Sequence, residues 1–239
     1  MPNPTAAMLV IGDEILSGRT RDSNTNHLAT ALTAAGIGLA EVRIVRDDAG
    51  AIAGAVKALS VAYDYVFTSG GIGPTHDDIT ADAVAEAMGA AIDVREDARA
   101  VLAAHYERSG TDLNAARLRM ARIPEGAALI ENPVSAAPGF ILGNVHVMAG
   151  VPAIFEAMVA SVLPTLTGGA PLLSRSMDVH RGEGDIAGPL AELAERYPQL
   201  SFGSYPFQRG GLHGANVVAR GHDAEALDAA MADLAERFE

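Results

Sequence analysis

The amino-acid sequence predicts an α/β protein with a mostly parallel sheet covered by helices on both faces, followed by a smaller α+β domain. Short apolar runs alternate with helical patterns along the first two thirds of the chain, which is typical of parallel sheets. The segment Thr167–Pro171 is rich in the glycine and proline residues that are typical of linkers. We therefore expect a larger domain at residues 1–168 and a smaller domain at residues 169–239.

Each element is expected where an apolar pattern is bounded by capping or turn residues. Strands of the larger domain are expected at residues 6–11, 39–45, 64–68 and 128–131, and in a hairpin, residues 140–142 and 145–148, that turns at Gly143-Asn144. Helices are expected to begin at Ser23-Asn24, Asp47-Asp48 and Thr80, with further helical patterns at residues 96–122, interrupted at Ser109-Gly110, and at residues 153–166. The smaller domain is expected to run as strand 173–179, helix 186–196, strands 201–205 and 215–219, and helix 224–238.

Composition excludes several classes of function. The chain of 239 residues has no cysteine, which excludes disulfides, zinc–thiolate sites and thiol nucleophiles. Lys57 is the only lysine, so a P-loop lysine or a Schiff base is not expected. The formal charge of −13 disfavours binding to nucleic-acid phosphates. No apolar run approaches the ~18 residues of a membrane span, and no basic segment typical of a secretory signal opens the chain. We expect a cytoplasmic protein without nucleic-acid or membrane partners.

The segment Ser69–Thr80 is the most informative in the chain. It leaves a predicted buried strand and enters a predicted helix, at the sheet edge where open parallel sheets bind ligands. The amides of Gly70, Gly71 and Gly73 could approach an anion closely, because glycine has no Cβ. The N-terminus of the following helix favours negative charge, and the hydroxyls of Ser69, Thr75 and Thr80 add donors. These features predict a phosphate-binding loop, although the segment matches neither a P-loop nor a dinucleotide fingerprint.

Acidic residues stand beside this predicted anion site. Asp77-Asp78 would repel a phosphate by ~4 kcal/mol per charge pair at 4 Å and an effective dielectric of 20, unless a divalent cation of the Mg²⁺ kind lay between them. Capping of the next helix by Asp78 is the alternative interpretation. Gly12-Asp13-Glu14 and Asp47-Asp48 follow two other strands and should reach the same edge, with a favourable helix N-terminus as the alternative for Asp47-Asp48.

Several motifs of the larger domain occur together in a known family. They are Gly12-Asp13-Glu14-Ile15-Leu16-Ser17-Gly18, Asp22-Ser23-Asn24, Asp47-Asp48, the Ser69–Thr80 segment, Asn132-Pro133, Ala137-Pro138-Gly139-Phe140 and Gly150-Val151-Pro152. With these motifs, residues 5–166 resemble the molybdopterin-binding domain of CinA-type (competence/damage-inducible protein A) proteins. The chain departs from the usual pattern at Ser23, where threonine is common, and at Ala149, where proline is common.

The resemblance implies a three-layer fold like that of molybdenum cofactor biosynthesis proteins, which binds a phosphorylated pterin or a nucleotide. It implies either metal-dependent cleavage of an ADP-ribose-like pyrophosphate or a pterin-binding module without catalysis. The part from Leu172 resembles the small KH-like domain of the same group. The deamidase domain of full-length members is not expected here, and related domains suggest a homo-oligomer.

The resemblance also implies roles for individual residues. The aspartate that follows the second strand in the family matches Asp47 or Asp48, of which we choose Asp48. Asp48 and Asp78 are then the expected catalytic carboxylates, and Asp48, Asp77 and Asp78 are the expected ligands of Mg²⁺, with Co²⁺ as an alternative cation. Molybdopterin is a candidate ligand. The residues expected to bind the ligand and its phosphate are Gly12, Asp13, Glu14, Ser23, Asn24, Ser69, Gly70, Gly71, Gly73, Thr75 and Thr80.

Overall fold

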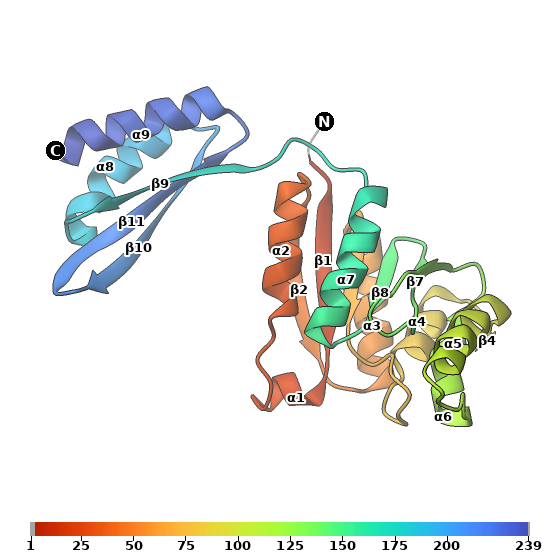
Figure 1. Cartoon of the computed structure of the whole chain (residues 1–239). Coiled ribbons are helices and arrows are strands. Elements are labelled where there is room, and N and C mark those ends of the chain that lie inside the picture. The colour runs from red at the N-terminus through yellow and green to blue at the C-terminus, as the bar shows by residue number, and fades with distance from the viewer. Residues whose placement is uncertain (1–2, 239) are drawn as a thin grey trace. The chain divides into compact units, whose positions relative to one another are not determined.

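The computed structural model describes residues 3–238 and has two compact units, of which one ends at Gly169 and the other begins at Ala170. Figure 1 shows the larger unit as a sheet between helices and the smaller as strands under two helices. Each unit has its own buried clusters of apolar side chains.

The larger unit is built on a mixed sheet whose strands, within the described residues, follow the order β2-β1-β3-β8-β7-β6. The parallel strands are β1 (Thr5–Ile11), β2 (Gly38–Val45), β3 (Tyr65–Ser69) and β8 (Val145–Met148). The antiparallel hairpin places β7 (Gly139–Leu142) next to β8, and β6 (Ala128–Ile130) lies at the far edge. The predicted mostly parallel α/β sheet is confirmed.

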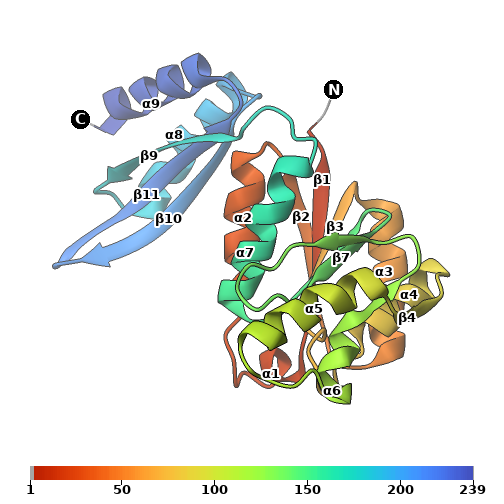
Figure 2. The same cartoon turned by 45° about the vertical axis from the view of Figure 1, so that its right-hand side comes forward.

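Helices cover both faces of this sheet, as Figures 1 and 2 show. One face packs against α2 (Asn24–Ala34) and α7 (Pro152–Val162), and the other against α3 (Ala49–Ala62) and α4 (Thr80–Met88). The alternation of strand side chains explains the three layers. Along β1, Met8 and Val10 point into the first core, whereas Leu9 and Ile11 point into the second.

The helical pattern at residues 96–122 is interrupted at Ser109-Gly110, as expected, and it also departs from a helix after that break. It forms α5 (Glu96–Arg108), α6 (Ala115–Leu118), the 3-10 turn η1 (Arg119–Ala121) and strand β5 (Arg122–Pro124), which pairs with β4 (Ile92–Val94). Gly110 ends α5 in a left-handed conformation (φ +65°), and the Asn114 side chain caps α6 by accepting from the Arg117 amide at 3.0 Å. The short α1 (Asp13–Leu16) was also not predicted, and the last helical pattern ends as η2 (Leu163–Thr165).

The smaller unit is α+β, as predicted. Its antiparallel strands lie in the order β10-β11-β9, and α8 (Glu183–Arg196) and α9 (Ala224–Phe238) cover one face. Strand β9 (Leu173–Val179) matches its predicted bounds. The predicted strands 201–205 and 215–219 were too short, because β10 (Ser201–Arg209) and β11 (Leu212–Gly221) continue to a tight turn at Gly210-Gly211. Both glycines have positive φ, +58° and +83°, as this type of hairpin turn requires.

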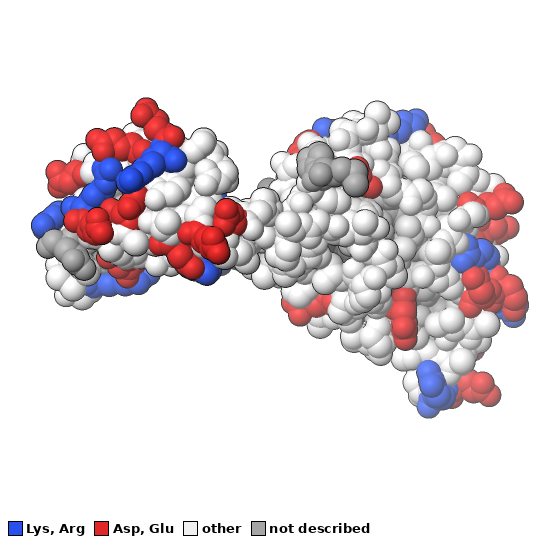
Figure 3. All heavy atoms as spheres, turned by 90° about the horizontal axis from the view of Figure 1, so that it is seen from above, with Lys and Arg blue, Asp and Glu red and all other residues white. Residues whose placement is uncertain are grey.

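Charges on the smaller unit are intermixed rather than segregated, as Figure 3 shows. Arginines pair with acids across its elements, in Arg175–Asp228, Arg196–Asp233 and Arg237–Glu192. Among the described residues, no helix combines the length and the apolar content needed to cross a lipid bilayer.

Candidate anion-binding cleft

A cleft of about 680 Å³ opens at the edge of the larger sheet where the parallel strands end. The chain leaves β1 toward β2 on one side, and β3 lies on the other side of β1. This reversal of strand order opens the crevice in which α/β sheets bind ligands. Loops that follow β1, β2, β3 and β8 line the cleft, through Gly12, Asp47, Gly71 and Gly150 among others.

The floor of the cleft is a glycine loop, and a side chain would not fit at Gly70 or at Gly71. Gly70 and Gly71 have φ values of +113° and +69°. A Cβ on Gly70 would lie 2.2 Å from the Ile11 carbonyl oxygen, and a Cβ on Gly71 would lie 2.1 Å from the Thr80 hydroxyl. The backbones of the loops after β1, β3 and β8 therefore approach one another more closely than any other residue type would allow.

Three successive amides of this loop are free to bind a ligand. In the described part of the chain, the N–H groups of Gly71, Ile72 and Gly73 donate to no protein acceptor, whereas the Gly70 N–H donates to the Met148 carbonyl at 3.2 Å. Backbone N–H groups in such a loop form concavities that bind anions. The structure thus places Gly70, Gly71 and Gly73 where the sequence predicted a phosphate-binding loop.

Asp77 and Asp78 lie at the end of the glycine loop, and both line the cleft. One carboxylate oxygen of Asp78 accepts hydrogen bonds from the Thr75 amide at 2.8 Å and from the Thr75 hydroxyl at 2.5 Å. The other oxygen of Asp78 has no hydrogen-bond partner among the described residues. Hydrogen-bond donors of the Thr75–Asp77 turn, and after them the nearby His76 ring, lower the pKa of the Asp77 carboxyl, so that it is ionised at neutral pH.

The structure places the neighbouring carboxylates of Asp47 and Asp48 differently. Asp48 is exposed and caps α3, accepting from the Ala51 amide at 2.9 Å, and it does not line the cleft. Asp47 lines the cleft and accepts from the Asp13 amide at 2.9 Å. Successive side chains leave the chain in different directions at this helix start, so only one of the pair reaches the ligand side.

Of the other residues predicted on the first loops, Gly12 and Glu14 line the cleft, and the Glu14 carboxylate folds back against Gly12. Asp13 does not line it and lies 3.6 Å from the Arg46 side chain. Thr75 does not line the cleft either, and its hydroxyl donates to the carboxylate of Asp78.

Asn24 and Ser69 act inside the protein rather than on the cleft surface. The Asn24 side chain, 5% exposed, donates to the Ser69 hydroxyl and to the Gly150 carbonyl, both at 2.8 Å. These bonds tie the start of α2 to the end of β3 and to the loop after β8. Ser23, Asn24 and Ser69 line a small hollow of about 60 Å³ beside the main cleft, so their contact with a ligand stays a prediction.

Thr80 is also internal. It is fully buried, its amide donates to the Gly71 carbonyl at 3.0 Å, and its hydroxyl has no hydrogen-bond partner among the described residues. The first turn of α4 directs this side chain toward the core, where it lies against Gly71, so a contact between Thr80 and a phosphate stays a prediction.

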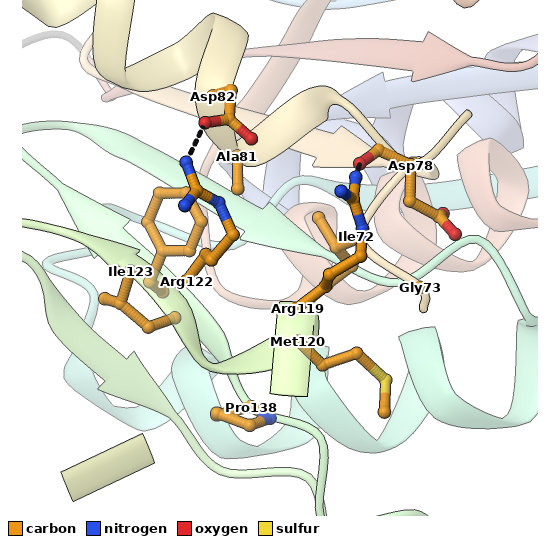
Figure 4. Close-up of a pocket in the computed structure, with 12 residues that line it drawn as sticks. Ile72, Gly73, Asp78, Ala81, Asp82, Arg119, Met120, Arg122, Ile123 and Pro138 are labelled. Carbon is orange, nitrogen blue, oxygen red and sulfur yellow. Dashed lines mark hydrogen bonds and ion pairs between the residues drawn. The ribbon is translucent and has the colours of Figure 1, made fainter. Parts of the chain in front are cut away.

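Arg119 was not predicted as a site residue. It lies behind the glycine loop and donates to the Asp78 backbone carbonyl at 3.3 Å, while its Nε has no partner in the described residues. Figure 4 shows this contact, together with the neighbouring ion pair between Arg122 and Asp82. Arg119 comes from η1, in the part after Gly110 whose pattern predicted a helix up to Arg122, so no sequence signal indicated that it turns toward Asp78.

The wall opposite the first loops is less charged. Tyr106 and Met120 line it, together with a turn at residues 132–138. The Asn132 side chain holds this turn by accepting from the Val134 and Ser135 amides, each at 3.1 Å, and it is 5% exposed. Asn132 and Gly150 belong to motifs that carry the family resemblance, whereas nothing in the pattern indicated Tyr106.

The carboxylates of the cleft do not form a complete cation site on their own. Among residues 3–238, no group of three or more His, Asp or Glu side chains is placed to hold a metal ion. Oxygen donors are nevertheless the ligands that Mg²⁺ prefers, and it usually binds through one or two carboxylates together with substrate phosphates. The donor set therefore suits a cation that arrives with a phosphorylated ligand.

Comparison with known proteins gives two family matches. Residues 7–168 match the family described as the probable molybdopterin binding domain, and residues 171–239 match the middle domain of FAD synthase.

Individual relatives agree with these matches. A CinA-like protein of Citrifermentans bemidjiense is 41% identical over 167 residues, which cover 68% of this chain and 40% of the relative. A protein of Pyrobaculum arsenaticum is 34% identical over 246 residues, covering 98% of this chain and 92% of that protein. The crystal structure of CinA from Thermoplasma acidophilum, described as of unknown function, aligns with a TM-score of 0.62 at 34% identity, covering 67% of this chain and 98% of that one. Against three curated relatives, the matched region spans 40 to 64% of their length.

Proposed function

Because this chain belongs to the family of the probable molybdopterin binding domain, with CinA-like proteins among its relatives, we propose that its cleft binds a phosphorylated pterin or a nucleotide together with a divalent cation. The observation that carries the proposal is the row of free amides at Gly71, Ile72 and Gly73, which faces the same cleft as Asp47 and Asp78. The amides suit an anion and the carboxylates suit a cation, and a metal–phosphate ligand satisfies both.

The roles in this proposal follow from position. The amides of the glycine loop hold the phosphate, and the apolar wall with Tyr106 and Met120 accepts a flat ring system. Asp47 and Asp77, which both line the cleft, would hold Mg²⁺, so Asp47 replaces Asp48 of the sequence prediction and Asp78 keeps its free oxygen for the reaction described below. When bound, the cation would neutralise phosphate charge and polarise a phosphoanhydride or a water molecule.

For catalysis, we propose hydrolysis of an ADP-ribose-like pyrophosphate. The water oxygen adds to one phosphorus as the bridging P–O bond breaks, which gives two phosphate monoesters and releases a proton. The free carboxylate oxygen of Asp78 is the group placed to accept that proton, because its other oxygen already binds Thr75.

The alternative is a pterin-binding module without catalysis. It is favoured by the description of the family that residues 7–168 match, a probable molybdopterin binding domain, because that description names binding and no reaction. Such a module would bind through the same amides and leave its ligand unchanged.

The test is calorimetry and product analysis with ADP-ribose, FAD, ATP and molybdopterin, each with and without Mg²⁺ or Co²⁺. Binding with Mg²⁺-dependent formation of phosphate monoesters supports the enzyme. Thermal stabilisation without product supports the module. If none of these ligands binds, the proposal is wrong.

Asp78→Asn is the variant that probes the mechanism, since asparagine keeps an oxygen for Thr75 but loses the negative charge. We expect turnover to fall by at least ~100-fold, the usual effect of losing a general base. Asp112→Asn is the matched control, because Asp112 is exposed and does not line the cleft. Unchanged turnover in Asp78→Asn would remove Asp78 from the mechanism.

A further inference from the structure

Strand β2 is an outer strand of the large sheet and carries exposed apolar side chains. Among the described residues it pairs only with β1. Val42 and Ile44 are 40% and 43% exposed. An outer strand with apolar side chains and free backbone groups is a template for pairing with another strand.

The direction of the free backbone groups follows from one hydrogen bond. The Gly12 N–H donates to the Val45 carbonyl at 3.1 Å, so the backbone groups of Val45 point toward β1. Because neighbouring residues of a strand alternate in this direction, the N–H and C=O groups of Val42 and Ile44 point away from β1, and no strand of the described chain lies beside them. These two residues therefore offer both unpaired backbone groups and apolar side chains.

The other face of β2 carries opposite charges two residues apart. Glu41 and Arg43 lie opposite β1 residues whose side chains pack against α3. Their own side chains form an ion pair, with 2.5 Å between the Arg43 Nε and a carboxylate oxygen of Glu41. The Glu41 carboxylate also accepts from the Tyr63 hydroxyl at 2.7 Å. The side chains of Glu41 and Arg43 are 32% and 39% exposed, so each keeps surface for a further partner.

We propose that β2 pairs with β2 of a second copy of this chain, antiparallel and centred on Val42. In this arrangement Val42 lies opposite Val42 of the other copy as a hydrogen-bonded pair, and Glu41 lies opposite Arg43 of the other copy. Glu41 and Arg43 of the two copies then form two cross-strand pairs of opposite charge, which are related by the two-fold axis. Such pairs stabilise the association of the strands.

Charge selects this register over its neighbours. Centring on Arg43 would place the two Arg43 side chains directly opposite each other. Centring on Ile44 would place Glu41 opposite Asp47. Like charges directly opposite are destabilising, so only the Val42-centred register joins opposite charges.

A bulge limits the length of the pairing. Ala6 pairs with Leu39 and Ala7 with Glu41, so Ala40 is an extra residue in β2. Bulges protect sheet edges, but this one lies before the regular segment Glu41–Val45 and leaves it free to pair.

The experiment uses sedimentation velocity of the full chain, 24.6 kDa as a monomer, from about 1 to 500 µM, a range that covers Kd values of weak to moderate complexes. We expect a concentration-dependent dimer in the wild type. Val42→Lys places two like charges on the axis and should raise the apparent Kd at least ~10-fold, as should Val42→Glu. Mixing the two variants should restore a dimer, because lysine then faces glutamate. Val101→Lys is the matched control, since Val101 on α5 is 44% exposed, about as much as Val42, and α5 packs against η1.

Amide hydrogen exchange of the wild type gives a second measurement that does not depend on variants. The Val42 and Ile44 amides should become protected as the concentration rises. The proposal is overturned by a wild type that stays monomeric, by a dimer that Val42→Lys leaves intact, by a mixture that does not re-associate, or by Val42 and Ile44 amides that exchange equally at all concentrations.

Discussion

Replacing Asn24 by alanine should destabilise the larger unit substantially. The change removes two hydrogen bonds, to the Ser69 hydroxyl and to the Gly150 carbonyl, both 2.8 Å long and shielded from water. Each is worth about 1 kcal/mol net, and leaving buried partners unsatisfied adds to the loss. Alanine regains about 0.5 kcal/mol through its higher helix propensity. We expect the free energy of unfolding to fall by about 2 to 3 kcal/mol.

For a unit of this size, such a loss lowers the melting temperature by about 4 to 12 °C. Circular dichroism and tyrosine fluorescence suit the assay, since the chain has no tryptophan. Asn26→Ala is the control, because Asn26 is exposed on the same helix and gains the same helix propensity. A double-mutant cycle with Ser69→Ala should give a coupling of about 1 kcal/mol.

The reasoning is refuted if Asn24→Ala and Asn26→Ala differ by less than about 0.5 kcal/mol, or if the cycle with Ser69 gives no coupling. Either result would mean that Asn24 does not tie α2 to the loops of the cleft. Asn24 would then return to its predicted role as a residue that contacts the ligand.

Three further predictions follow from single contacts. Asp48→Ala should lower the free energy of unfolding by about 1 kcal/mol through the lost α3 cap, while calorimetry shows unchanged ligand affinity; a loss of affinity would contradict the placement. Gly71→Ala should abolish ligand binding and lower the melting temperature, since its Cβ would meet the Thr80 hydroxyl at 2.1 Å, and Gly54→Ala, with open space at its Cβ, should do neither. Burial lowers the pKa of His146 below its usual 6.5, so below that pH the unfolded state binds more protons than the native state, and stability falls as the pH drops toward the native pKa. His146→Gln should weaken this acid sensitivity in melts between pH 8 and pH 5; an identical pH dependence would mean that His146 does not contribute to it.

The framework of the fold could be predicted because its signals are local. Apolar runs bounded by glycine or acidic caps marked β1, β3 and α4, and β9 and α9 were predicted at their observed bounds. The segment after α5 could not be predicted, since its side chains fit a helix and only contacts with β4 make Arg122–Pro124 a strand. For β10 and β11, the Gly210-Gly211 pair was a usable turn signal that the prediction did not apply.

In the candidate site, too, some residues could be predicted from local signals, whereas the positions of others depend on packing between elements. The glycine loop was predictable because glycines directly after a buried strand are typical of a backbone that must approach another group closely. The choice between Asp47 and Asp48 depended on which carboxylate the α3 amides would capture, and Thr80 depended on how the first turn of α4 is rotated. Such rotations are set by packing between elements, which spacing along the chain does not encode.

The close approach of Gly150 to Gly70, where a Cβ would lie 3.2 Å from the Gly70 Cα, has a consequence for selectivity. The base of the cleft consists of backbone peptide groups that pack against one another. Binding of a ligand there orders few rotatable side-chain bonds of the protein, so it costs little conformational entropy. Under the proposed function, discrimination among ligands falls to the wall formed by Tyr106 and Met120, whose half-buried side chains pack against the core and give that wall a fixed shape.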